Sequence, residues 1–259
     1  VIGEGAFGKV YKVKEKNGET IYAAKISKKT INSSTDASSK ASKISLRREV
    51  NILSKLNHPA ILKFICYSPV NFKQKPKPVI VTEYAPNGTL YDLMKLEQQM
   101  LAKDEWNDTR KLIILYGVAS AMSYLHSHKI VHRDLKPQNI LMDSCLLPKI
   151  ADFGLSKINH SNESMTMKST VGSIKGTPLY IAPEIWEKQE YTEAGDVYAF
   201  GMIMYEMITA EQPFKELNVN EQTVFEVAER IKSGERPQFT YEIPETYRIL
   251  IERCWDHDP

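Results

Sequence analysis

The sequence predicts an α+β protein in two parts, an antiparallel sheet with one main helix followed by a mostly helical remainder. Residues 9–16 and 19–26 alternate apolar and polar side chains, which is the pattern of a half-buried β-hairpin. Residues 44–56 and 109–126 instead repeat apolar side chains at helical spacing. Between the two parts, residues 83–88 contain a proline and a glycine, which indicates a linker.

The chain has 259 residues, 42% of them hydrophobic and 25% charged, as in ordinary globular proteins with a sizeable core. A net charge of +2 gives no reason to expect nucleic acid or a membrane surface as a partner. No run of residues is apolar over the length of a membrane span. Cys66, Cys145 and Cys254 lack metal-ligand spacing, so we expect reduced thiols and a cytoplasmic location. The chain begins without methionine and ends at Pro259, so we expect a domain of a longer protein that could carry targeting segments elsewhere.

The N-terminal hairpin begins with a glycine-rich stretch, Gly3-Glu4-Gly5-Ala6-Phe7-Gly8, that fits the pattern GxGxxG. A dinucleotide-binding version of this pattern would begin a helix, whereas here a strand, Asn17-Gly18 and a second strand follow. The Walker pattern would need GK[ST], which Gly8-Lys9-Val10 does not supply. The stretch therefore predicts a flap whose backbone amides can close over phosphates, with a plain glycine-rich hairpin as the alternative.

Lys25 lies on the returning strand after two alanines, in a half-buried pattern where a charge needs a partner. We expect this partner to be Glu49, which lies beside the apolar stripe of the helix at 44–56. Residues 28–43 are rich in Ser and Lys and predict a flexible loop. Further strand-like runs follow at 61–67 and 79–82.

A second hairpin, predicted from the apolar runs 140–142 and 149–151, would hold several polar side chains on one side. The oxygens of Asn139 and Asp152 suit Mg²⁺, which prefers a few protein ligands together with substrate phosphates. Asp134 can accept a hydrogen bond from an incoming hydroxyl, and Lys136 supplies positive charge where a phosphoryl group would develop negative charge.

Two motifs in this region resemble the catalytic and metal-binding loops of eukaryotic protein kinases: His132-Arg133-Asp134…Asn139 and Asp152-Phe153-Gly154. The resemblance spans nearly the whole chain, because Ala23-Ala24-Lys25 is similar to the kinase V-A-I-K and Ala182-Pro183-Glu184 matches the family's Ala-Pro-Glu. The sequence Asp134-Leu135-Lys136-Pro137 favours serine/threonine over tyrosine specificity. The linker and the ending Cys254-Trp255 look like the tyrosine-kinase-like group of serine/threonine kinases.

The resemblance implies a two-lobed fold, with an N-lobe at 1–82, a hinge at 83–88 and a C-lobe at 89–259 that is truncated at its C-terminal end. It implies transfer of the γ-phosphoryl group of Mg²⁺-bound ATP to Ser or Thr hydroxyls of protein substrates. The implied catalytic residues are Asp134, Lys136, Asn139, Lys25 and Glu49. The implied ATP-binding residues are Ile2, Gly3, Glu4, Gly5, Gly8, Val10, Ala23, Lys25, Thr82, Glu83, Ala85, Leu141 and Asp152. Asn139 and Asp152 would bind the metal, and for Val10, Ala23 and Leu141 a core role is the alternative.

Regulation is also implied by the resemblance. Arg133 would pair with a phosphate on the following loop, so we expect phosphorylation at Ser169, Thr170 or Ser173, including trans-autophosphorylation. Thr177 would instead be architectural, with a hydrogen bond to the Asp134/Lys136 pair.

The remaining expectations concern the helical part. Asp196 begins an apolar helix, where a buried acid needs hydrogen-bond donors, and the resemblance implies that it binds backbone amides of the His-Arg-Asp loop. In the helix at 109–126 the expected inward stripe is Leu112, Leu115, Tyr116, Ala119, Met122 and Leu125. His126 and His128 are expected at the surface or as satisfied core residues, and His132 is expected to pack.

Three other functions compete with a protein kinase. A pseudokinase, which would bind nucleotide as a scaffold, usually lacks the lysine, the base or a metal ligand, and all of these are present here. An ATPase or a small-molecule kinase is disfavoured by the segment from Gly176 to Glu184, which in the family shapes a peptide-binding platform.

Overall fold

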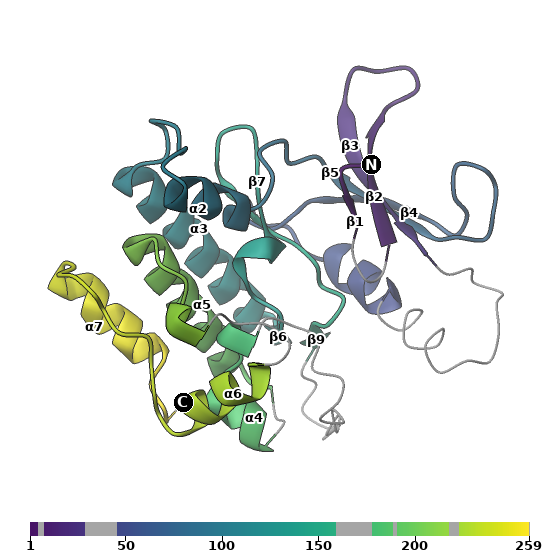
Figure 1. The fold of residues 1–259 in the computed structure, drawn as a ribbon. Coiled ribbons are helices and arrows are strands. Elements are labelled where there is room, and N and C mark those ends of the chain that lie inside the picture. The colour runs from purple at the N-terminus through teal and green to yellow at the C-terminus, as the bar shows by residue number, and fades with distance from the viewer. Residues whose placement is uncertain (5–7, 29–45, 159–177, 189–190, 218–222, 259) are drawn as a thin grey trace.

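The computed structural model describes residues 1–4, 8–28, 46–158, 178–188, 191–217 and 223–258. An antiparallel sheet and the helix of residues 46–53 form one part of the molecule, and the long helices form the other (Figure 1). The predicted two-part α+β fold is therefore confirmed.

The sheet has five strands in the order β1-β2-β3-β5-β4, and every neighbouring pair is antiparallel. Its strands are β1 (Gly3–Glu4), β2 (Gly8–Lys14), β3 (Ile21–Ser27), β4 (Phe64–Ser68) and β5 (Val79–Glu83). The predicted first hairpin is present as β2 and β3, but its strands are shorter than expected. The connection at 15–20 closes through a hydrogen bond from the Glu15 amide to the Thr20 carbonyl (3.1 Å), so pairing ends at Lys14 and Ile21.

The helix of residues 46–53 carries Glu49 and buries Ile52 and Leu53. These two side chains belong to the same hydrophobic core as Ile150 and Phe153 of the helical part. Residues 29–43 of the predicted Ser/Lys-rich loop lie outside the described residues.

The helical part begins after the predicted linker. Its helices are α2 (Leu90–Gln98), α3 (Asp108–Ser127), α4 (Pro183–Lys188), α5 (Glu193–Thr209), α6 (Val224–Lys232) and α7 (Glu245–Cys254). Its short strands are β6 (Ile130–Val131), β7 (Ile140–Met142), β8 (Pro148–Ile150) and β9 (Lys157–Ile158). The described residues of this part also contain the 3-10 turns η1 (Pro137–Asn139), η2 (Pro178–Tyr180) and η3 (Lys215–Leu217).

Side-chain caps fix where the first two helices begin. The hydroxyl of Thr89 accepts a hydrogen bond from the Asp92 amide, and the Asp92 carboxylate accepts one from the Thr89 amide, which is a complete capping box. Asn107 caps α3 by accepting from the Arg110 amide. Helix α2 therefore begins directly after the linker.

The predicted inward stripe of α3 is partly wrong. Leu115, Met122 and Leu125 are buried, but Leu112 is 51% exposed and Tyr116 is 76% exposed. The remaining buried positions of the helix are Lys111, Ile114, Val118 and Ala121. The apolar residues of α3 lie on all sides of the helix. Their spacing therefore could not identify the face that packs against β6, β8 and α5.

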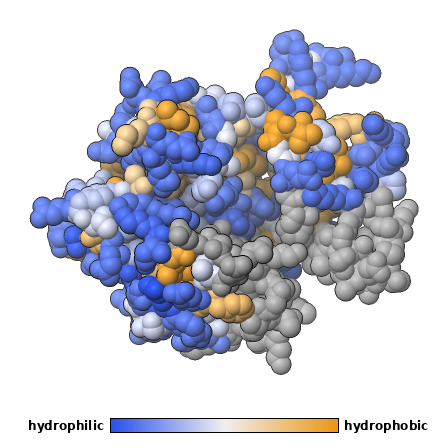
Figure 2. Space-filling model, in the orientation of Figure 1, coloured by the Kyte–Doolittle hydropathy of each residue, from blue (hydrophilic) through white to orange (hydrophobic). Residues whose placement is uncertain are grey.

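Helix α5 forms the centre of the helical part, where it packs against α3 and α7. Most of its residues are buried, including Tyr198, Met202 and Ile203. The visible surface is mostly hydrophilic, with apolar side chains gathered over the sheet (Figure 2). Among the described residues, no helix combines the length and apolar character that a membrane span requires.

Candidate active site

The sheet brings Lys25 to the helical part of the molecule. Lys25 lies on β3, the middle strand of the sheet, and its Nζ lies 2.8 Å from Oε1 and 2.9 Å from Oε2 of Glu49. The ion pair expected between these residues is therefore present. The same ammonium lies 3.4 Å from Oδ1 of Asp152, a residue 127 positions away in the chain.

Lys25 and Asp152 hold each other in the ionised state, whereas burial raises the pKa of Glu49 above its usual value although the Lys25 ammonium opposes that rise. Burial alone would lower the pKa of Lys25, but the carboxylates of Glu49 and Asp152 hold it above its usual value. Burial alone would raise the pKa of Asp152. The Lys25 ammonium, His132 and a hydrogen bond from the Gly154 amide instead hold it below its usual value. We conclude that Asp152 is an anion and Lys25 a cation near neutral pH.

A second cluster surrounds Asp134. The Nζ of Lys136 lies 2.9 Å from each carboxylate oxygen of Asp134. The side-chain nitrogen of Asn139 donates to the backbone carbonyl of Asp134 (2.7 Å) and to its Oδ2 (2.8 Å). Pro137 begins the turn η1, which reverses the chain so that Lys136 and Asn139 both face Asp134.

The loops that carry Asp134 and Asp152 are tied together by the backbone. The carbonyl of Asn139 accepts from the Ala151 amide (2.8 Å), and the Ala151 carbonyl lies 3.1 Å from Nε2 of His132. His132 is fully buried and packs edge-on against the ring of Phe153, with ring centroids 5.1 Å apart. His132 is thus a packing residue, as expected.

Backbone strain also marks both loops. Asp152 has a φ of 63° and Arg133 a φ of 70°, in the left-handed region that side chains disfavour. Asp196 supports the strained loop, because its carboxylate accepts from the amides of His132 (2.8 Å) and Arg133 (2.9 Å). This predicted contact is present, and His126, expected to be satisfied, lies 2.9 Å from the same carboxylate.

The predicted phosphorylation sites Ser169, Thr170 and Ser173 lie outside the described residues, so the predicted contact of Arg133 with them stays a prediction. Thr177 lies outside them as well. The Arg133 guanidinium stacks on Tyr191 at 5.1 Å from the ring centroid, and its Nε is buried without a hydrogen-bond partner in the described part of the chain. Burial, with help from the charge of nearby Arg48, lowers the pKa of Arg133.

The residues predicted to contact adenine lie around the end of β5. Thr82 is buried and pairs with Ala23 across the sheet, and its hydroxyl donates to the Glu83 carbonyl (3.1 Å). Ala23, Val10 and Leu141 are each only half-buried. Partial exposure suits residues that line a site better than residues that fill a core. Ala85 and Ile2 are half-buried and exposed, respectively.

The glycine-rich stretch is described except for Gly5, Ala6 and Phe7. Gly3 and Glu4 form β1, and the Glu4 carboxylate pairs with Lys28 (2.9 Å) and Lys9 (3.3 Å). A Cβ atom at Gly8 would lie 2.5 Å from the backbone oxygen of Ile26. The absence of a side chain at Gly8 is therefore required by the close approach of β3.

The side-chain oxygens of Asn139 and Asp152 fit a magnesium site that is shared with phosphates better than a site whose ligands all come from the protein. The Asn139 nitrogen binds Asp134, which directs its side-chain oxygen elsewhere, and Asp152 supplies an ionised carboxylate. Within the described ranges, no group of three or more His, Cys, Asp or Glu side chains could enclose a metal ion. Two hard oxygens without a full protein cage match the preference of Mg²⁺ for sites shared with phosphates.

Two buried or half-buried pairs were missed by sequence reasoning. Glu206 of α5 accepts a hydrogen bond from the Tyr180 hydroxyl inside the core, and Lys149 of β8 forms an ion pair with Glu83 (3.3 Å). A lone glutamate within an apolar helix is a usable signal for the first pair, because a buried acid needs a donor. For the second pair the sequence contains no such signal.

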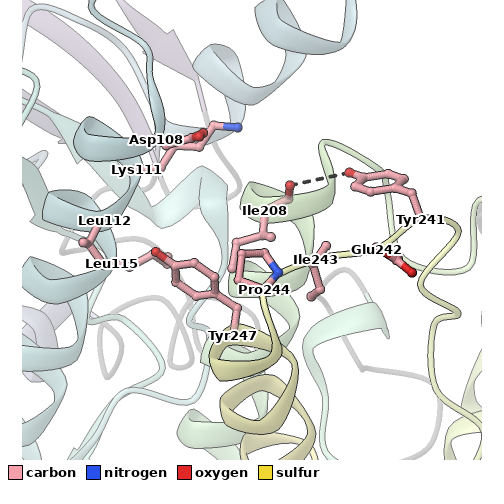
Figure 3. A pocket seen from close by; sticks show the side chains of 10 residues that line it. All are labelled: Asp108, Lys111, Leu112, Leu115, Ile208, Tyr241, Glu242, Ile243, Pro244 and Tyr247. Atoms are coloured by element: carbon pink, nitrogen blue, oxygen red, sulfur yellow. Dashed lines mark hydrogen bonds between the residues drawn. The ribbon is translucent and has the colours of Figure 1, made fainter.

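A separate cavity of about 270 Å³ lies between the start of α3, the end of α5 and residues 241–247 (Figure 3). Apolar side chains such as Leu115 and Ile208 line it together with the charged Asp108, Lys111 and Glu242. At its edge the Tyr241 hydroxyl contacts the carbonyls of Thr209 and, at 3.5 Å, of Ile208. None of the predicted catalytic residues contributes to it.

A family model described as "Protein kinase domain" matches residues 1–259. The "Putative serine/threonine-protein kinase/receptor R826" of Acanthamoeba polyphaga mimivirus is 36% identical over 98% of this chain, which spans 14% of that relative's length. The "Dual specificity protein kinase shkC" of Dictyostelium discoideum is 34% identical over 100% of the chain and 47% of its own length. The "Serine/threonine-protein kinase CTR1" of Arabidopsis thaliana is 37% identical over 82% of the chain and 24% of its own length.

Proposed function

Because the chain belongs to the protein kinase domain family, we propose that it transfers the γ-phosphoryl group of ATP to serine or threonine hydroxyls of protein substrates. The observation that carries this proposal is the position of Lys25, whose ammonium lies within 3.4 Å of both Glu49 and Asp152. A lysine held between two carboxylates is a fixed positive charge suited to the α- and β-phosphates. Turnover is favoured over a pseudokinase because the chain contains Lys25, Asp134, Asn139 and Asp152, the residue types that pseudokinases usually lack.

In the proposed reaction, the Asp134 carboxylate orients the acceptor hydroxyl and takes its proton as the hydroxyl oxygen bonds to the γ-phosphorus. The bond from that phosphorus to the β–γ bridging oxygen breaks, and ADP leaves with the electron pair. Lys136, which contacts Asp134 at 2.9 Å, carries positive charge next to the transferred group. Most of the rate would come from placement and charge stabilisation, since phosphoryl transfer requires little covalent chemistry.

Asn139 and Asp152 would hold Mg²⁺, which when bound neutralises the negative charge of the phosphates. We further propose that adenine lies among Val10, Ala23 and Leu141 beside the backbone of Glu83 and Ala85, with Thr82 behind it. Ile2, Gly3, Glu4, Gly5 and Gly8 would cover the phosphates. In this proposal residues 83–88 form the hinge between lobes at 1–82 and 89–259.

The chain spans only 14% of the length of the mimivirus relative. That the whole protein acts on protein substrates is therefore also part of this proposal. Trans-autophosphorylation of Ser169, Thr170 or Ser173, with a phosphate that would pair with Arg133, is part of it. A cytosol-like compartment is supported by the free thiols of Cys66, Cys145 and Cys254.

Dual specificity is a second candidate, favoured by the 34% identity to a relative named as a dual specificity kinase. Incubation with radiolabelled ATP and peptides whose only hydroxyl is Ser, Thr or Tyr separates the two. Label on the Ser and Thr peptides alone supports the first candidate, and label on all three supports the second.

The same assay with Asp134→Asn tests the proposed base. We expect label incorporation to fall at least about 100-fold, in line with the loss of a general base. Asp104→Asn is the matched control, because Asp104 is exposed and lies in the loop before α3. Unchanged activity in Asp134→Asn would exclude Asp134 as the base.

A further inference from the structure

Two consecutive side chains at the end of β5 and the start of the proposed hinge are held by lysines from opposite sides. Lys149 of β8 places its Nζ 3.3 Å from Oε1 of Glu83, and Lys12 of β2 places its Nζ 4.9 Å from the ring centroid of Tyr84. We call these four residues the hinge clamp. One arm comes from the sheet and the other from the hairpin of the helical part.

The Glu83 carboxylate lies where three segments meet. Besides Lys149, its Oε1 accepts from the backbone amide of Lys63 (2.8 Å), and the Glu83 amide donates to the Lys63 carbonyl (3.0 Å). The stretch that contains Lys63 is in turn bound to β8. The Ile150 amide donates to the Ala60 carbonyl (2.8 Å), and the Leu62 amide donates to the Ile150 carbonyl (2.9 Å). Glu83 therefore joins β5 to β8 both directly and through residues 60–63.

Strand β8 leads directly to the proposed metal ligand. Lys149 pairs with Leu141 across the hairpin, and Asp152 follows three positions later. A displacement of β8 relative to β5 would change the spacing between the proposed adenine contacts and Asp152. The Glu83–Lys149 pair opposes that displacement.

The two arms differ in strength. The side chains of Lys149 and Glu83 are only 15% and 28% exposed, so water screens their attraction less than that of a surface pair. Lys12 is exposed, and a cation–π contact in water is weak. The Glu83–Lys149 arm is therefore the stronger one.

We propose that Glu83 and Lys149 are positioning residues for nucleotide binding: their ion pair fixes the start of the hinge against the strand that leads to Asp152. The Lys12–Tyr84 contact is a weaker supporting arm. This inference rests on the proposed kinase function, since it assigns the pair a role in holding the nucleotide.

The test is a double-mutant cycle with Glu83→Gln and Lys149→Met. Glutamine keeps an acceptor for the Lys63 amide, and methionine keeps the length of the lysine stem. The readouts are the Kd for Mg²⁺-ADP, kcat and KM for ATP, thermal stability, and hydrogen exchange of the Leu62 and Lys63 amides without nucleotide. Lys14→Met is the matched control, because it removes an exposed ion pair with Glu19 (2.7 Å) that includes neither Glu83 nor Tyr84.

Each single variant is expected to weaken ADP binding by about 3- to 10-fold, and the double variant should bind no more weakly than the weaker single variant. KM for ATP should rise by a similar factor, whereas kcat should change less than about twofold at saturating ATP. Lys149→Arg, which keeps the charge, should restore most of the affinity. Lys12→Met should weaken binding less than about threefold, and Lys14→Met should not change it.

Several results would overturn the inference. One is unchanged or tighter ADP binding in Lys149→Met, and another is a double variant whose loss equals the product of the single losses. In the absence of nucleotide, the Leu62 and Lys63 amides should exchange faster in Lys149→Met than in the wild type. Unchanged exchange would contradict the hinge clamp whatever the binding data show. If the wild-type domain itself bound no nucleotide, the proposed function would fail, and the exchange data would still decide whether the clamp joins these segments.

Discussion

The side-chain nitrogen of Asn139 donates to both the backbone carbonyl and the carboxylate of Asp134, at 2.7 and 2.8 Å. One amide therefore fixes the rotamer of the proposed base while its oxygen stays available as a metal ligand. The two proposed tasks of Asn139, orienting Asp134 and holding Mg²⁺, should be separable by substitution.

Asn139→Ala should lower kcat by about 100-fold or more, because both the orienting hydrogen bonds and one hard oxygen are lost. Asn139→Asp keeps one hard oxygen but replaces the donor nitrogen with a second oxygen, which puts another carboxylate beside Asp134. We expect this variant to retain measurable Mg²⁺-dependent nucleotide binding while its kcat stays low. Titration of Mg²⁺ against ADP binding, together with steady-state kinetics, measures both effects. Equal Mg²⁺ affinity in the wild type and Asn139→Ala would argue against Asn139 as a ligand.

Lys25→Met should affect stability as well as activity, because it leaves the carboxyl group of Glu49, which is 5% exposed, buried without its partner. Breaking a buried pair in this way costs about 3 kcal/mol of unfolding free energy. Combining it with Glu49→Leu should recover much of that loss but none of the phosphotransfer. Urea unfolding and the labelled-ATP assay on both variants test this separation. Recovery of activity in the double variant would exclude Lys25 as a phosphate-binding residue.

Glu206 should make stability depend on pH. Burial raises its pKa from 4.5 to about 7, with the hydrogen bond from Tyr180 acting in the opposite direction. Between these values the folded protein keeps a proton that the unfolded chain releases, so the unfolding free energy falls as pH rises from about 4.5 to 7. The full contribution is on the order of 3 kcal/mol.

Glu206→Gln keeps an acceptor for Tyr180 but does not titrate, so its unfolding free energy should depend less on pH across this window. Chemical unfolding of both proteins between pH 5 and pH 8 measures the difference. Parallel pH profiles would show that Glu206 does not titrate in this range.

Gly8 and Gly3 should respond differently to alanine. A Cβ at Gly8 would lie 2.5 Å from the Ile26 carbonyl oxygen, whereas a Cβ at Gly3 would meet nothing closer than Val10 at 3.9 Å. Gly8→Ala should therefore displace β2 from β3, lower the melting temperature by several degrees and raise KM for ATP. Gly3→Ala should leave the melting temperature nearly unchanged. Similar melting temperatures for the two variants would contradict the packing described for Gly8.

The sequence was informative wherever chemistry restricted the choice of residue. A lysine in a half-buried strand needed a carboxylate, which identified Glu49. An acid at the start of an apolar helix needed donors, and the resemblance to protein kinases identified the backbone amides that Asp196 binds. Local patterns likewise predicted the hairpins β2–β3 and β7–β8.

The sequence was uninformative where several residues satisfied the same rule. Helix α3 carries apolar side chains on all sides, so Leu112 and Tyr116 were wrongly assigned to its buried face. Glu83 and Lys149 are common surface residue types 66 positions apart, and only the fold brings them together. The left-handed backbone of Asp152 and Arg133 depends on tertiary hydrogen bonds that local sequence does not encode.

The attachment of Asp196 to the His132 and Arg133 amides has a consequence for genetics. Asp196 belongs to the largely buried helix α5. A substitution that displaces this helix should therefore displace the loop of Asp134 without contacting the reacting groups. Gly201, for example, faces Cys254 of α7 so closely that an added Cβ would lie 2.8 Å from it. Inactivating substitutions in this domain should therefore include interior positions far from the proposed nucleotide site, and a loss of activity alone would not locate a substitution at the catalytic centre.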